Sequence, residues 1–160
     1  MSYTLKAHPH INEIGSTAWD ACANPILTDP YCGIPFDPFV SYAFLNALED
    51  SASAVSETGW APYHIALATE KDEDTILGVV PMYLKNHSQG EYVFDHSWAD
   101  ALERAGGRYY PKLQVSVPFT PATGRRLLTP SHPDAPDRET ALMAGMTQVA
   151  EELNVSSIHV

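Results

Sequence analysis

Side chains suited to acid–base chemistry and binding are concentrated in one stretch of the sequence, residues 90–121. Histidine titrates near neutral pH, so a histidine beside a carboxylate suits the role of general base. His96 follows Asp95 directly, which makes His96 the candidate base and Asp95 the group that orients it. The same stretch contains a candidate general acid, Tyr109, and candidate substrate-binding residues, Tyr110, Lys112 and Gln114.

Each of these residues also has a structural explanation that involves no chemistry. Asp95 can cap a helix that begins at Ser97, and His96 can pack beneath that helix. The two tyrosines can be aromatic core residues, and Lys112 can be a solvated lysine. The residue types alone therefore leave both explanations open.

The composition limits the classes of function. The chain has 160 residues, of which 44% are hydrophobic and 18% are charged, so we expect one globular domain spanning residues 1–160. A net charge of −11 argues against a surface that follows nucleic-acid phosphates, so no DNA partner is expected. Cys22 and Cys32 fit neither a zinc pattern nor a disulfide framework, and no metal is expected. No apolar run predicts a signal peptide or a membrane span, which favours a cytoplasmic protein.

Apolar periodicity predicts an α+β fold, a mixed and largely antiparallel sheet flanked by helices. Alternation with period two indicates strands, and apolar spacing of three to four residues indicates helices. A charged turn between the first two predicted strands indicates an antiparallel hairpin, and Pro81 requires a bulge or an edge position in the second of them. The predicted strands are 62–69, 76–85, 112–119 and 155–160, and the predicted helices are 12–24, 38–50, 97–105 and 138–153.

The strand pattern also predicts which side chains are buried. Side chains alternate along a strand, so Lys112, Gln114 and Ser116 should share the polar face of strand 112–119. The predicted core residues are Leu113, Val115, Val117 and Phe119 of that strand, Val79 or Val80, Trp98, Leu142, Met146 and Leu153.

The chain ends within its last predicted strand, at Val160. We therefore expect residues 1–160 to be the N-terminal half of a longer, two-domain protein, inactive without its C-terminal half. A sheet edge exposed in this way is prone to strand addition, so dimerisation through that edge is a further expectation.

Four blocks of the sequence, residues 37–45, 83–88, 90–96 and 107–114, resemble a known family. The most specific segments are Val-Phe-Asp-His and Tyr-Pro-Lys-Leu-Gln within the last two blocks. They resemble the bacterial FemAB-like N-acyltransferases of the GNAT superfamily, which are often labelled peptidoglycan biosynthesis or recognition proteins. The resemblance implies a GNAT-like fold and transfer of an acyl or aminoacyl group to an amine of a small molecule or peptidoglycan precursor. The alternative is a module on the same scaffold that recognises a ligand or a protein without catalysis.

The resemblance implies acyl-CoA or aminoacyl-tRNA as the donor. GNAT enzymes that use coenzyme A hold its pyrophosphate with a short glycine-rich loop at a helix N-terminus. Here the corresponding connection, residues 120–136, is long and has the single Gly124, followed by Arg125 and Arg126. These arginines suit bidentate contacts with phosphate or carboxylate, although a loop surface also explains them. A net charge of −11 is a poor match for tRNA, which a C-terminal half could bind instead.

The predicted elements place the candidate residues together. Helix 97–105 ends at Gly106 and Gly107, where the chain can turn back toward strand 112–119. We therefore expect one cleft beside the start of that strand, with Arg125 or Arg126 at its mouth. The residues expected to converge there are Asp95, His96, Tyr109, Lys112 and Gln114.

Overall fold

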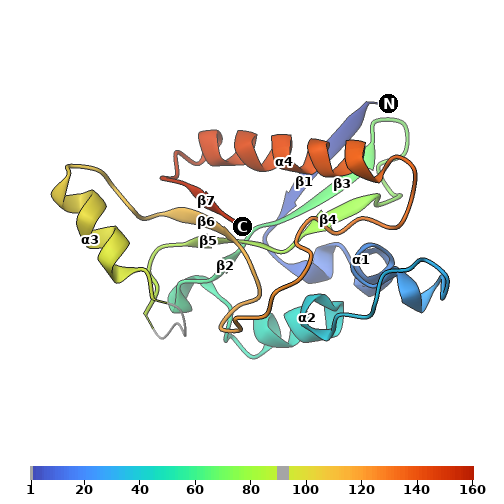
Figure 1. The fold of residues 1–160 in the computed structure, drawn as a ribbon, viewed down its shortest axis with the longest axis horizontal. Coiled ribbons are helices and arrows are strands. Elements are labelled where there is room, and N and C mark those ends of the chain that lie inside the picture. The colour runs from blue at the N-terminus through green and yellow to red at the C-terminus, as the bar shows by residue number, and fades with distance from the viewer. Residues whose placement is uncertain (1, 90–93) are drawn as a thin grey trace.

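The computed structural model describes residues 2–89 and 94–160 and has the predicted α+β fold (Figure 1). Its strands are β1 (Tyr3–His8), β2 (Ala61–Pro62), β3 (His64–Thr69), β4 (Gly78–Val80), β5 (Met82–Lys85), β6 (Lys112–Val115) and β7 (Ile158–His159). Its α-helices are α1 (Ser16–Ala23), α2 (Tyr42–Asp50), α3 (His96–Arg104) and α4 (Ala135–Glu152). The strands form two small sheets, in the orders β1–β3–β4 and β2–β5–β6–β7. The pair β6–β7 is parallel and the other named pairs are antiparallel.

The predicted hairpin is confirmed, and Pro81 divides it between the two sheets. Strand β3 pairs with β4 in the first sheet, whereas β2 pairs with β5 in the second. Proline has no N–H to donate to a strand partner, so a regular ladder is interrupted at this residue. The N–H of Tyr63 donates to the Met82 carbonyl at 2.8 Å and keeps the two arms together beside the break. The same hairpin therefore joins both sheets.

Strand β1 was not predicted. It pairs antiparallel with β3 along its full length, with Leu5 opposite Leu67. Tyr3, Leu5 and Ala7 alternate with polar residues, so the period-two signal was present but short. Pairing with β3 covers an edge that a hairpin alone would leave exposed.

The predicted strand 112–119 is shorter than expected and ends at Val115. Pro118 cannot donate a ladder hydrogen bond, and Phe119 has a φ of 57°, in the left-handed region that extended strands exclude. Phe119 is half-buried against Trp60 and is not in the strand core, so its predicted burial was wrong. Leu113, Val115 and Val117 are buried as predicted.

Helices cover both sides of the strands (Figure 1). Helix α4 buries Leu142 and Met146 against β3, β4 and the strands of the second sheet, as predicted. Helices α1 and α2 lie on the other side, where Trp19 and Leu45 pack against Val79. Val80 is also buried, and Leu153 is partly buried beside the α4 cluster.

A pair of hydrogen bonds closes the loop formed by residues 25–36. The buried amide of Asn24 accepts from the Asp37 N–H at 2.8 Å and donates to the Asp37 carbonyl at 3.0 Å. Between these two residues the chain extends outward, and Tyr31 is 95% exposed. The loop is thus fixed at its base, at the C-terminal end of α1.

Helix α3 lies at one end of the molecule, apart from the other helices (Figure 1). It begins at His96, one residue before the predicted start, and Ala99 is its buried residue. Trp98, predicted to be in the core, is 72% exposed. That prediction was wrong because amphipathic spacing identifies an apolar stripe but not what the stripe packs against.

The buried Leu113 and the exposed Trp98 predict different effects of substitution on the free energy of unfolding. Leu113→Ala should lower the free energy of unfolding by roughly 2–5 kcal/mol because it leaves a cavity in the core. Trp98→Ala should change it by less than about 0.5 kcal/mol because the indole is largely solvated. Urea unfolding of both variants measures the difference, and equal losses would contradict this placement of α3.

A buried hydrogen-bond cluster centred on Glu49 connects α2, β3 and the segment after β1. The Glu49 side chain is 6% exposed. It lies 2.8 Å from His64 Nε2 and accepts from the Ile11 N–H at 3.0 Å. Burial lowers the pKa of His64, although its contact with Glu49 opposes that shift. The folded protein therefore favours neutral His64.

Stability should consequently fall in mild acid. The unfolded chain binds a proton at His64 more readily than the folded chain does, so the contribution of His64 is complete above its ordinary pKa of about 6.5 and is lost as pH falls below it. We expect the free energy of unfolding to be lower at about pH 5.5 than at about pH 7.5. His64→Gln should reduce this difference in urea titrations, and an unchanged difference would exclude His64 as its source.

Candidate functional site

A buried ion pair joins β6 to the residue that precedes α3. Lys112 is the first residue of β6, and its Nζ lies 2.5 Å from Asp95 Oδ2. The Lys112 side chain is 4% exposed and that of Asp95 is 16% exposed. An ammonium group in such a position requires a carboxylate partner. The solvated-lysine explanation of Lys112 was therefore wrong.

Two tyrosines complete the environment of Asp95. The Tyr109 hydroxyl donates to Asp95 Oδ2 at 3.1 Å, and the Tyr110 hydroxyl donates to Oδ1 at 2.7 Å. Ser88 Oγ lies 2.7 Å from the Tyr110 hydroxyl. The carboxylate is thus held from three sides, by Lys112 and by both phenols.

These contacts set the charge state of the group. Burial alone would raise the pKa of Asp95, but hydrogen bonds from Lys112, Tyr110 and Ser88 outweigh burial and hold the pKa well below its ordinary value. Burial and the Asp95 carboxylate raise the pKa of Tyr109 to about 12. Near neutral pH, Asp95 is ionised and Tyr109 keeps its proton.

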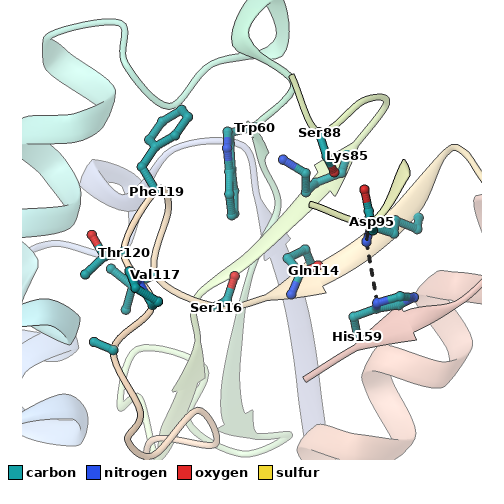
Figure 2. A pocket seen from close by; sticks show the side chains of 13 residues that line it. Trp60, Lys85, Ser88, Asp95, Gln114, Ser116, Val117, Phe119, Thr120 and His159 are labelled. Atoms are coloured by element: carbon teal, nitrogen blue, oxygen red, sulfur yellow. Dashed lines mark hydrogen bonds and ion pairs between the residues drawn. The ribbon is translucent and has the colours of Figure 1, made fainter. Parts of the chain in front are cut away.

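The ion pair forms part of the wall of a cavity of about 310 Å³ (Figure 2). Asp95 and His159 lie on one side of it, Trp60 and Phe119 lie on the other, and Gln114 lies between them. The cavity is therefore polar at one end and aromatic at the other. The remaining lining residues are Lys85, Ser88, Lys112, Ser116, Val117, Thr120, Pro121 and Ala122.

Several residues selected from the sequence meet here. Asp95, Lys112 and Gln114 line the cavity, and Tyr109 and Tyr110 hold Asp95 from behind. Asp95 occupies the N-cap position of α3 but makes no side-chain cap hydrogen bond, because its carboxylate is turned toward Lys112. The helix-cap explanation of Asp95 was therefore wrong. The Gln114 amide has no hydrogen-bond partner within the described ranges, which leaves it available to a ligand.

The structure does not bring His96 or the arginine pair to the cavity. His96 is exposed, and its ring stacks on Phe94 at a centroid distance of 5.6 Å. Arg125 donates to the carbonyls of Ala23 and Thr129 at 2.8 and 3.1 Å. Arg126 donates to the carbonyls of Arg125 and Ala122. Both arginines brace the long loop, and neither lines the cavity.

Trp60 and His159 line the cavity but were not selected from the sequence, whereas Lys85 ends the second predicted strand and could be expected at the rim of a cleft there. The Lys85 Nζ lies 3.7 Å from the centroid of the Trp60 ring, a cation–π distance. In β7, His159 pairs with Gln114 in parallel register. Its Nδ1 lies 3.4 Å from Lys112 Nζ, and its Nε2 lies 2.9 Å from Ser157 Oγ. No local sequence signal identifies His159, because its position beside Gln114 comes from the parallel pairing of β6 and β7.

Neither a metal site nor a membrane-crossing helix is present among the described residues. Within residues 2–89 and 94–160, no group of three or more His, Cys, Asp and Glu side chains is placed to hold a metal ion. None of the helices described is long and apolar enough to cross a membrane. The N-terminus of α4 carries Asp134 at the cap and Asp137 in the first turn. These carboxylates disfavour an anion at that helix end.

Comparison with known proteins identifies the family. Residues 10–160 match the model of the FemAB-like family, described as peptidoglycan biosynthesis/recognition, and the chain belongs to this family. No curated protein sequence matches the chain. A solved structure of the ribosomal-protein-alanine N-acetyltransferase from Brucella melitensis biovar Abortus 2308 is similar at 14% identity and a TM-score of 0.49. The alignment covers 99% of this chain and 79% of that one, and a likeness at this score carries no inference about activity.

The buried ion pair makes a direct prediction. Asp95→Asn should lower the free energy of unfolding by roughly 3–5 kcal/mol because it leaves the Lys112 ammonium buried without a carboxylate. Adding Lys112→Met should recover part of this loss. Asp100→Asn, an exposed carboxylate of the same helix, is the matched control and should change little. Urea unfolding measures all three variants, and equal effects of the Asp95 and Asp100 substitutions would refute the role of the pair.

Proposed function

We propose that this chain is part of an N-acyltransferase and that its cavity binds the amine that accepts the acyl group. Membership of the FemAB-like family supports acyl or aminoacyl transfer and a substrate related to peptidoglycan. The observation that carries the proposal is the wall of the cavity, where a buried ammonium–carboxylate pair is fixed by two phenols. Such a wall provides preorganised charge without rearrangement during a reaction.

The individual residues suit acyl transfer in different ways. Gln114 can bind a polar group of the acceptor, because its amide makes no hydrogen bond to the described part of the chain. Lys112 places a positive charge at the wall, where it favours negative charge on the acyl oxygen during attack. Asp95 and Tyr109 hold the ammonium in position. In this proposal Tyr109 positions Lys112 and does not supply a proton, because its raised pKa keeps the phenol strongly protonated.

The donor and the cellular context are part of the same proposal. An acyl-CoA or an aminoacyl-tRNA would supply the acyl group, and a small molecule or peptidoglycan precursor would supply the amine. Both donors are made in the cytoplasm, which is where we place the reaction. The acidic N-terminus of α4 favours a donor site supplied outside these residues.

A second candidate is recognition of a ligand without catalysis. The observation that favours it is the mutual satisfaction of Asp95, Lys112 and the two tyrosines, which a binding wall needs as much as a catalytic one does. Binding of a muropeptide with no turnover of any donor would select this alternative.

The proposal is tested with the full-length protein, CoA thioesters or aminoacyl-tRNA, and muropeptide amines. Gln114→Ala should raise KM for the amine about tenfold while changing kcat little, since a lost neutral hydrogen bond is worth roughly 1 kcal/mol or slightly more. Gln148→Ala, on the surface of α4, is the matched control and should leave KM unchanged. Absence of turnover with all donors would overturn the transferase proposal. An unchanged KM in Gln114→Ala would show that the acceptor amine does not bind in this cavity.

A further inference from the structure

We infer that His159 is the group that takes the proton from the acceptor amine. This inference rests on the proposed acyl transfer and assigns a catalytic residue to the same cavity. His159 lines the cavity beside Lys112 and Asp95, on the neighbouring strand β7 (Figure 2). The exposed His96 does not line it.

The hydrogen bonds of His159 define which ring nitrogen is basic. A protonated lysine can only donate, so Nδ1, which faces Lys112 Nζ, is an acceptor. The proton of the neutral ring is then on Nε2, which donates to Ser157 Oγ at 2.9 Å. The Lys112–Nδ1 distance of 3.4 Å is long for a hydrogen bond, whereas Lys112 lies 2.5 Å from Asp95. Nδ1 is therefore weakly engaged and can accept from a substrate.

Burial and the neighbouring Lys112 ammonium favour the neutral form of His159. Burial lowers the pKa of His159, and the nearby Lys112 ammonium lowers it further, while the Asp95 carboxylate acts in the opposite direction. Tyr109, whose ring centroid lies 6.0 Å away, is protonated near neutral pH, and Lys85 lines the same cavity. A neutral imidazole is the form that can accept a proton.

The chemical step needs no redox partner. The nitrogen of the acceptor amine attacks the carbonyl carbon of a thioester or ester donor and forms a C–N bond. Nδ1 of His159 takes the proton released from that nitrogen. The C–S or C–O bond of the donor then breaks, and the leaving thiolate or alkoxide takes the proton from the imidazolium. His159 returns to its neutral form, so atoms and charges balance.

The adjoining positive charge provides a specific test. The rate constant kcat/KM should fall at low pH, when His159 becomes protonated. Lys112→Met removes the ammonium that depresses the pKa of His159, so the acid limb of the profile should move to higher pH. NMR titration of the His159 ring should show a shift in the same direction without substrate. If His159 had only a structural role, the acid limb of kcat/KM would not follow the pKa of its ring.

The activity test uses the full-length protein. We expect His159→Gln to lower kcat/KM about 100-fold or more, within the range for loss of a general base. His132→Gln, an exposed histidine on the loop before α4, is the matched control and should retain activity. Thermal unfolding of each variant separates loss of the fold from loss of chemistry, and the pH limb of Lys112→Met tests the base without altering His159.

The outcomes distinguish this inference from the proposed function. Turnover by the wild type that survives His159→Gln, or that is lost in His96→Gln instead, overturns the assignment of His159 alone. An acid limb that does not move in Lys112→Met also overturns it. No turnover by the wild type with any thioester or aminoacyl donor overturns the transferase proposal and the inference together.

Discussion

Much of this structure is arranged around one buried ammonium group, that of Lys112. Lys112 begins β6 at a position where water is excluded, and a charge in such a place is tolerated when a carboxylate and further hydrogen bonds surround it. Asp95 supplies the carboxylate, and Tyr109 and Tyr110 bind its oxygens. The chain before α3, the segment after it and the second sheet are joined at this point.

The same requirement explains the unusual start of α3. A carboxylate at a helix N-cap normally accepts from the backbone of the first turn. Asp95 instead faces Lys112, because a buried ion pair broken on one side costs more than a lost cap. The helix accordingly begins without a side-chain cap and extends away from the body (Figure 1). The ion pair ties its N-terminal end to β6, while Trp98 and Leu102 of its apolar stripe remain exposed.

The sequence predicted the parts of the fold that depend on local patterns, such as the β3–β4 hairpin, the core face of β6 and helix α4. It also placed Lys112 and Gln114 together, because alternation along a strand depends on nothing distant. Alternation could not predict that Lys112, on the polar face of β6, is buried, because the residues that bury it are Asp95 and the two tyrosines. His159 was missed for a similar reason. A parallel pairing across the long connection between β6 and β7 has no local signature in the sequence. Asp95 and His96 are adjacent in the sequence, which suggested that they act together, but the backbone directs their side chains to different places.

The paired hydrogen bonds between Asn24 and Asp37 have a consequence for how this protein can diversify. They fix both ends of residues 25–36 at one place, so the length of chain between them is not dictated by the core. Doubling the length of a flexible loop costs only about 0.6 kcal/mol in closure entropy. Insertions there would leave the ion pair and the cavity intact. The loop can therefore lengthen and present a new contact surface while the cavity on the second sheet remains unchanged.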